Sequence, residues 1–288
     1  MKAVLKRELH SYFHGMTGYI FCFLLLIIVG LYTYFNNINN LLVNFEISLG
    51  MSSYLFLMLA IPVLTMRIIA EEKKQGTDKL LYSLPLSSFE IVIAKFIAMV
   101  IVYLLPIIVI AFYPLILAKF GAVPVITCYS TLFAFFLLGT SMLAIGMFIS
   151  SLVENQIIAA ILTFFIIAVN YFLSAYASGI SGTPKTSFWV LSFMIIAFML
   201  LVYFMTKHIV LSIIISVTLE TILIIIYFIS SILLENFIFN LVLSISVFKR
   251  LNTYVNDLFD ITGLIFYLSL TFLFLFFTIQ SFEKRRWN

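Results

Sequence analysis

The chain has 288 residues, of which 64% are hydrophobic and 10% are charged, and its formal net charge is +4. Soluble domains are about half apolar and about a quarter charged, so this composition excludes a soluble globular protein and indicates an integral membrane protein. In such a protein the side of the bilayer on which each charge lies matters more than the net charge, and we expect no nucleic-acid partner.

Apolar segments long enough to cross a bilayer follow one another along most of the chain. A spanning helix needs about 20 mostly apolar residues, whereas a barrel strand alternates over about 10. The pattern therefore predicts an all-α integral membrane protein, a polytopic helical bundle with about eight transmembrane helices. The predicted spans are Gly18–Phe35, Ser52–Ile69, Ile91–Leu117, Ile126–Leu152, Gln156–Tyr176, Phe188–Met205, Ile209–Leu233 and Ile261–Ile279.

The basic residues predict the orientation of these spans. If the N-terminus is cytoplasmic, the outer side holds Lys119, Lys185, Lys249 and Arg250, and the other twelve of the 16 lysines and arginines lie on the inner side. Cytoplasmic loops carry the excess of lysine and arginine in membrane proteins. We therefore expect both the N-terminus and the C-terminus to be cytoplasmic.

Residues 1–15 have the pattern of a helix that lies flat in the inner membrane interface. Leu5, Leu9, Tyr12 and Phe13 fall on one helical face, while the basic residues of the stretch fall elsewhere. Such a helix buries its apolar face at the headgroup boundary and turns its cations toward anionic lipid. The alternative is a disordered tail.

Residues 70–90 form a polar hinge between the second and third spans, where the charges of the chain are most crowded. Gly76 can end one helix because glycine tolerates a positive φ, and Thr77 can cap the next one. Ser87 and Glu90 have the spacing of a capping box, which would start the third span.

A short amphipathic helix is predicted between these caps. Leu80 and Leu81 lie on the same side of it, and Pro85 ends it. The leucine face must be buried, either in the bilayer or in a groove of a soluble partner.

The fourth span is rich in small residues. Thr140 and Ala144 are four positions apart, as are Gly146 and Ser150. This spacing lets two helices approach closely, either within the subunit or at a subunit interface.

Glu220 is the acidic residue that lies well inside a predicted span. A charge there costs several kcal/mol and usually marks function, such as a proton or cation site. The structural alternative is a hydrogen bond between helices, for which Asn170 is a candidate partner.

Residues 235–260 are predicted to form an outer amphipathic or re-entrant segment. In their second half, Phe248, Leu251, Val255 and Leu258 share one face, which suits packing onto the spans. A floppy loop is the alternative.

Signatures of catalysis are absent from the sequence. It contains no phosphate-binding loop of the form G-x-x-x-x-G-K-[ST], no H-E-x-x-H and no G-x-S-x-G. Cys22 and Cys128 lie in apolar runs without metal-ligand spacing. We therefore expect no enzymatic activity, no catalytic residue, no metal and no cofactor on this chain.

Several stretches resemble the membrane subunit of type-2 ABC exporters. The main one is the string Arg67, Glu71, Glu72, Gly76, Thr77, Leu80, Leu81, Pro85 and Ser87, with Lys95 downstream. A second is "GMFISSLVENQIIAA", between the fourth and fifth spans, and weaker matches are the start, "KRELHSYFHGMTGYI", and the end, "YLSLTFLFLFFTIQSFEKRRW". Together they are most similar to the permease of the gliding-machinery type.

This resemblance implies a permease that works in pairs, as a homodimer or heterodimer, in the bacterial plasma membrane. Each copy would bind a cytoplasmic ATPase subunit that carries ATP and magnesium. The segment between the second and third spans would be the coupling helix, with Glu71, Glu72, Gly76, Thr77, Leu80, Leu81 and Pro85 at the ATPase contact. The family's basic design has six spans, so we expect the sixth and seventh spans to be an added hairpin.

The expected function is therefore that of the transmembrane permease subunit of an ATP-driven exporter with an unidentified substrate. Two alternatives stay open. One is a proton-coupled secondary transporter that uses Glu220, and the other is a membrane anchor that recruits an ATPase and transports nothing.

Overall fold

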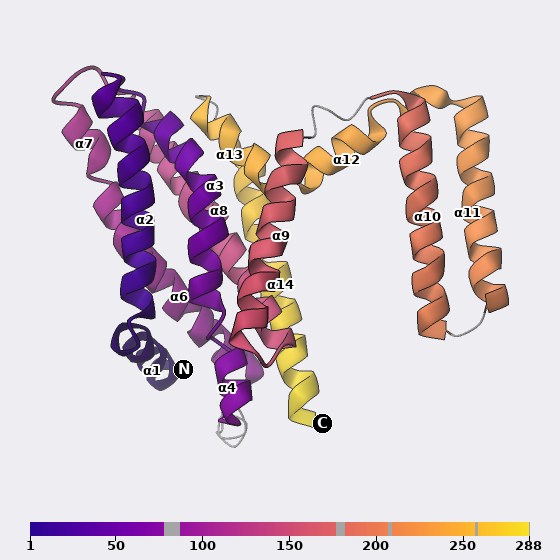
Figure 1. The fold of residues 1–288 in the computed structure, drawn as a ribbon, viewed down its shortest axis with the longest axis horizontal. Helices are drawn as coiled ribbons and strands as arrows, with labels where there is room; N and C mark the ends of the chain where they lie inside the picture. The colour runs from indigo at the N-terminus through magenta and orange to yellow at the C-terminus, as the bar shows by residue number, and fades with distance from the viewer. Residues whose placement is uncertain (78–86, 177–181, 207–208, 257–258, 288) are drawn as a thin grey trace. The chain divides into compact units, whose positions relative to one another are not determined.

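The computed structural model describes residues 1–77, 87–176, 182–206, 209–256 and 259–287, and these residues are mostly helical (Figure 1). The chain divides into two compact units. The core unit comprises Met1–Tyr171 and Val247–Asn288, and the hairpin unit comprises Phe172–Ser246.

In its described residues the core unit has six long helices and several short ones. Their bounds are α1 (Lys2–His14), α2 (Thr17–Thr33) with the π-helical turn η1 (Tyr34–Asn39), α3 (Phe45–Thr65), α4 (Ala70–Gln75), α6 (Ser88–Ile110), α7 (Tyr113–Leu117), α8 (Val125–Leu152), most of α9 (Gln156–Tyr176), α13 (Val247–Val255) and α14 (Ile261–Trp287). The hairpin unit contains α10 (Pro184–Thr206), α11 (Ile209–Ile229), the 3₁₀ turn η3 (Ser231–Leu234) and α12 (Phe237–Ile245).

Seven helical segments of the described chain are long and apolar enough to cross a membrane, or eight if α12 and α13 count as one broken span. This confirms the predicted all-α polytopic bundle. Six of the seven lie in the core unit, and the seventh is α11. The apolar part of α10 that is described, Pro184–Met199, is shorter than a full span.

The second span begins earlier than the predicted Ser52, because α3 starts at Phe45. The prediction stopped at the polar residues of this stretch, but the helix buries them with their hydrogen bonds made. The hydroxyls of Ser52 and Ser53 donate to backbone carbonyls of the preceding turn at 2.9 and 2.6 Å. Hydroxyls paired in this way are tolerated in an apolar setting.

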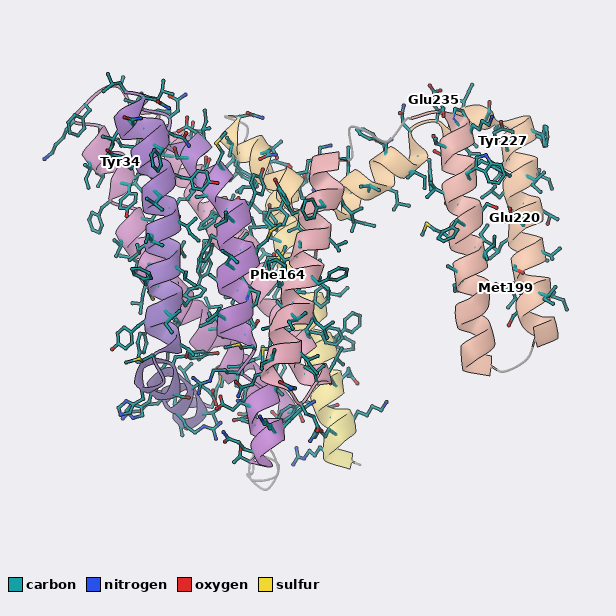
Figure 2. All side chains as sticks on the ribbon, viewed as in Figure 1. Tyr34, Phe164, Met199, Glu220, Tyr227 and Glu235 are labelled. Carbon is teal, nitrogen blue, oxygen red and sulfur yellow. The ribbon has the colours of Figure 1, made fainter. Side chains whose placement is uncertain are left out.

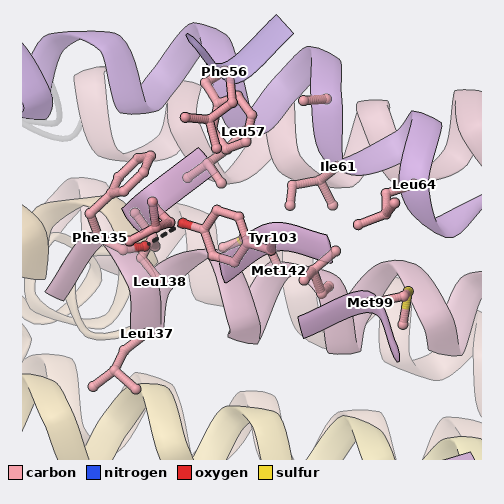
Figure 3. Close-up of a cluster of buried hydrophobic side chains, with 14 of the residues drawn as sticks. Phe56, Leu57, Ile61, Leu64, Met99, Tyr103, Phe135, Leu137, Leu138 and Met142 are labelled. Carbon is pink, nitrogen blue, oxygen red and sulfur yellow. Dashed lines mark hydrogen bonds between the residues drawn. The ribbon is translucent and has the colours of Figure 1, made fainter. Parts of the chain in front are cut away.

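Helix α8 lies at the centre of the core unit, against α3, α6, α13 and α14. Its Phe135 packs with Phe56 of α3 and Tyr103 of α6, at ring-centroid distances of 5.8 and 6.2 Å. The Tyr103 hydroxyl donates to the Phe135 carbonyl at 2.9 Å (Figure 3). Gly139 of α8 faces the same ring, and a Cβ atom at that position would collide with Tyr103.

Helix α13 packs on the spans of the core unit. Phe248, Leu251 and Tyr254 are fully buried, and Thr131 of α8 donates to the Tyr254 carbonyl at 3.1 Å. The packing uses the face predicted from the amphipathic pattern, with Tyr254 added to it. Leu258 lies outside the described residues.

Figure 1 shows α1, α4 and the final turns of α14 at one end of the core unit, and α7 and α13 at the other end. Helix α1 and the end of α14 therefore lie at the same end of the core unit. That both termini are cytoplasmic remains a prediction from the distribution of lysine and arginine.

Candidate functional site

Lys95 lies in the apolar stretch that opens α6, and its side chain is fully buried. Its Nζ atom lies 3.0 Å from Glu8 Oε1 of α1 and 2.8 Å from Glu72 Oε2 of α4. It also donates to the carbonyl of Ile68 at 2.9 Å. One buried cation thus joins three segments that are far apart in the sequence.

Arg7 completes this arrangement from the solvent side. Its Nη2 atom lies 2.6 Å from Glu8 Oε1 and 2.6 Å from Glu72 Oε1. Two cations and two carboxylates therefore alternate, and we refer to Arg7, Glu8, Glu72 and Lys95 as the ion-pair cluster. Buried charges persist only when they are paired and hydrogen-bonded in this way.

The cluster changes the acidity of Glu8. Burial alone would raise the pKa of this carboxyl group, but the charges and hydrogen bonds of Lys95 and Arg7 outweigh burial and hold the pKa below its ordinary value. Glu8 is therefore held as a carboxylate, which keeps the cluster electrically balanced.

A second ion pair lies beside the cluster. Arg67 Nε is 2.6 Å from Glu71 Oε2, and Arg67 Nη1 donates to the Thr17 hydroxyl at 3.4 Å. Beside this pair lies a cavity of about 330 Å³, whose lining includes Tyr12, both residues of this pair and three residues of the ion-pair cluster, Arg7, Glu8 and Glu72. The polar hinge therefore starts from a charged platform built on α1, α4 and α6.

Helix α8 is fastened to the same platform through Ser150. The Ser150 hydroxyl accepts hydrogen bonds from the backbone amides of Ile69 and Ala70 at 3.3 and 3.1 Å. These amides stand at the start of α4, where a helix has no backbone partners of its own for them. Lys73 of α4 reaches the carbonyl of Ser151.

The other small residues of α8 bring it against the spans of its own unit. A Cβ atom at Gly146 would lie only 2.5 Å from Thr65 Oγ1 of α3, so the backbone of α8 packs directly against the Thr65 side chain there. Ala144 is fully buried, and the Thr140 hydroxyl donates within α8 to Leu137 at 2.8 Å. These residues pack within the subunit.

The predicted helix end at Gly76 and the predicted capping box are present, whereas the helix that Thr77 was predicted to cap lies outside the described residues. Gly76 ends α4 with a φ of 70°, and Ser87 and Glu90 form the complete capping box at the start of α6. Thr77 itself contacts the preceding helix, because its amide donates to the Glu72 carbonyl of α4 at 3.0 Å. The remaining predicted contact residues, Leu80, Leu81 and Pro85, lie outside the described residues.

The two polar residues predicted inside the spans have partners near in space. Glu220, labelled in Figure 2, accepts a hydrogen bond through Oε1 from Ser192 of α10, and its buried Oε2 atom has no partner among the described residues. Asn170 of α9 accepts a hydrogen bond from the amide of Val247 at 3.1 Å. Glu220 thus links α11 to α10 in the hairpin unit, and Asn170 links α9 to the start of α13 in the core unit.

Sequence reasoning missed two acidic residues that the structure buries. Glu8 lies in residues 1–15, where the prediction rests on the apolar and basic residues alone. The signal for it is Lys95, because a lone lysine in an apolar run indicates an acidic partner. Glu46, in the first turn of α3, is also buried, and it accepts a hydrogen bond from the thiol of Cys128 at 3.3 Å. No group of residues in the described chain has the arrangement of a metal site.

The chain matches the model of a known protein family. A family model described as "ABC-2 family transporter protein" matches residues 29–185, which is more than half of the chain. The matched range contains the hinge, Lys95 and all of α8, and it ends at the start of α10. No curated protein and no solved structure matches the chain.

Proposed function

The chain belongs to the ABC-2 family of transporter permeases, and from this premise we propose that it moves its substrate outward by coupling to a separate ATPase chain through residues 70–90. Membership makes it a multi-pass membrane protein and the transmembrane subunit of an ABC transporter, not the ATPase. Permeases of this kind generally pair with ATPase subunits. We propose in addition that two permease copies assemble and that the chain is of the gliding-machinery type.

The observation that carries the coupling proposal is the ion-pair cluster. Glu72 lies in α4, the short helix that begins the hinge, and its carboxylate contacts Lys95 on α6 and Arg7 on α1. A movement of the hinge caused by a partner would therefore be transmitted directly to α1 and α6 through these ion pairs. The hydrogen bonds of Ser150 would transmit the same movement from the start of α4 to α8.

The physical role of each part follows from this arrangement. The partner ATPase would bind ATP and magnesium and would change its shape on closure. The hinge would move with it, and the platform of α1, α4 and α6 would tilt the spans between inward-open and outward-open states. Packed helices joined by buried ion pairs shift as rigid bodies, since close-packed interfaces do not deform continuously.

The leucine face of the hinge provides the direct test. Changing both Leu80→Asp and Leu81→Asp places two charges where an apolar contact is proposed, and we expect the ATPase to be lost when the permease is purified from native membranes. The matched control is Leu41→Asp, because Leu41 is 88% exposed and lies in the stretch between η1 and α3, away from the hinge.

Unchanged association of the ATPase with the double variant would contradict the coupling assignment. Transport by vesicles that hold a proton gradient but no ATP would contradict the ATP-driven mechanism and would favour a proton-coupled transporter centred on Glu220.

A further inference from the structure

A second cavity lies at the end of the core unit opposite to the ion-pair cluster. It has a volume of about 220 Å³ and lies between the turn that follows α2 and the short helix α7. Ile38, Leu42 and Val43 form one wall, and Ile116, Leu117 and Phe120 form the other. The walls are therefore almost wholly hydrocarbon.

The polar residue in the lining is already satisfied. The Asn37 side-chain amide donates to the Leu42 carbonyl at 2.9 Å, and its oxygen accepts from the Ser48 hydroxyl at 2.5 Å. It consequently has little to offer a polar ligand. A cavity with such a lining selects an apolar chain, because a polar group inside it would lose its hydrogen bonds to water.

The backbone around the cavity is strained. The turn η1, which begins at the Tyr34 labelled in Figure 2, is π-helical, and Leu41 has a φ of 55°. π-Helical turns are rare and are found frequently at functional sites, and a bulky residue in the left-handed region is an outlier. Strain of this kind persists only where the surrounding structure maintains it, and here it shapes one wall of the cavity.

The rim of the cavity shows what can reach it. The cavity lies where the spans Thr17–Asn39 and Ser88–Leu117 end, at the edge of the apolar layer. Leu41 and Phe120 at the rim are 88% and 79% exposed. In a multi-pass membrane protein the molecules beside such a rim are lipids, whose acyl chains are the apolar ligand in greatest supply.

We propose that this cavity binds the acyl chain of a membrane lipid. The strained turn and α7 form the two walls of the site, and the chain is recognised by apolar contact while the headgroup stays outside. The proposal does not depend on the direction of transport or on the ATPase.

The test uses the purified full-length chain in detergent and palmitate that carries a photoreactive diazirine near the end of its chain. We expect labelling of peptides that contain residues 37–43 and 116–120. We expect unlabelled palmitate to compete for the site and to suppress this labelling. The monoglyceride of palmitate should compete equally well, since the cavity contacts the chain and not the headgroup.

Two variants locate the label. Val43→Phe fills the cavity, and we expect at least about tenfold weaker labelling, because displacing about two buried methylene groups costs about that much affinity. The matched control is Val109→Phe on α6, where the side chain is 45% exposed on the apolar surface and labelling should not change. Phe120→Asp, at an exposed position, puts a charge at the mouth and should weaken labelling without disturbing the fold.

Labelling that unlabelled palmitate does not suppress would overturn the proposal. Labelling that spreads evenly over the exposed faces of the spans would overturn it as well. So would labelling that Val43→Phe and Phe120→Asp both leave intact.

Discussion

At the scale of single residues, the decisive group is Lys95, a buried ammonium in an apolar helix. Its charge is tolerated because two carboxylates and one backbone carbonyl surround its Nζ atom. Replacing a whole buried ion pair by apolar groups can be neutral, but removing one partner leaves the other charge buried and uncompensated. The ion-pair cluster therefore stabilises the contact between α1, α4 and α6 only when all four of its residues are present.

Lys95→Met should therefore be strongly destabilising. The methionine fills similar space, but Glu8 and Glu72 keep their negative charges with Arg7 as the remaining cation. We expect a loss of about 3–5 kcal/mol in the free energy of unfolding, measured by thermal or denaturant unfolding in detergent. Lys6→Met, at an exposed position on α1, is the control and should stay near wild type. Equal stability of the two variants would show that the cluster contributes nothing.

Glu8 makes the stability of the fold depend on acidic pH. Its pKa in the folded chain is below the ordinary value of 4.5, so the folded state binds the proton less tightly than the unfolded state does. The stabilisation is complete above the unfolded pKa and is lost as the pH falls below 4.5 through the folded pKa. Melting temperatures measured from pH 7 to pH 3 should fall more steeply for wild type than for Glu8→Gln in this acidic range. Parallel curves would contradict the assignment.

At the scale of elements, α8 owes its central position to small side chains at its contacts. Gly146 lets the backbone of α8 pack against the Thr65 side chain of α3, and the Ser150 hydroxyl accepts hydrogen bonds from the amides at the start of α4. These two residues are four apart, so they lie on the same face of α8 one turn from each other. Close approach and polar anchoring therefore act together at the helix that most of the core unit packs against.

Gly146→Ala should separate α8 from α3. The added Cβ would meet three atoms of the buried Thr65 side chain at 2.5 to 2.8 Å, and Thr65 is held by a hydrogen bond to the Ile61 carbonyl. Overpacking of this kind costs about 1–3 kcal/mol. Gly30→Ala in α2 is the matched control, because its Cβ would meet only Tyr113 Oη at 3.8 Å. Alanine favours a helix more than glycine does, so the control should be neutral or slightly stabilised. A fall in melting temperature of the same size in both variants would contradict the packing argument.

At the scale of the whole molecule, patterns among neighbouring residues predict the helices of the fold. The ion-pair cluster instead depends on contacts between residues far apart in the sequence. Runs of apolar residues and the Ser87–Glu90 capping box were readable because each is a feature of neighbouring residues. The pairing of Glu8 with Lys95 joins positions 87 apart, and no local pattern reports which carboxylate will meet which cation. For the same reason the early start of α3 was missed, since Glu46 and its serines look polar until their buried partners are known.

The division into two units predicts that the hairpin is separable. The family match ends at residue 185, and the ion-pair cluster, Ser150 and the aromatic core all lie in the core unit. The cut ends also lie close together, because the Val247 amide donates to Asn170 Oδ1 at 3.1 Å. A linker of about four residues can bridge them, since each extended residue spans about 3.3 Å or more. We therefore expect a chain in which a Gly-Ser linker replaces residues 172–246 to insert into membranes and to keep its cooperative unfolding transition.

Size-exclusion chromatography and thermal unfolding in detergent would measure this outcome. The control is removal of residues 125–152, which deletes α8 and should abolish accumulation of folded protein, because the core unit packs around that helix. If the chain without its hairpin aggregated as the control does, the hairpin would have to be part of the structural core. If it remained folded, transport assays on the same variant would show whether Glu220, which lies in the removed part, is needed for activity at all.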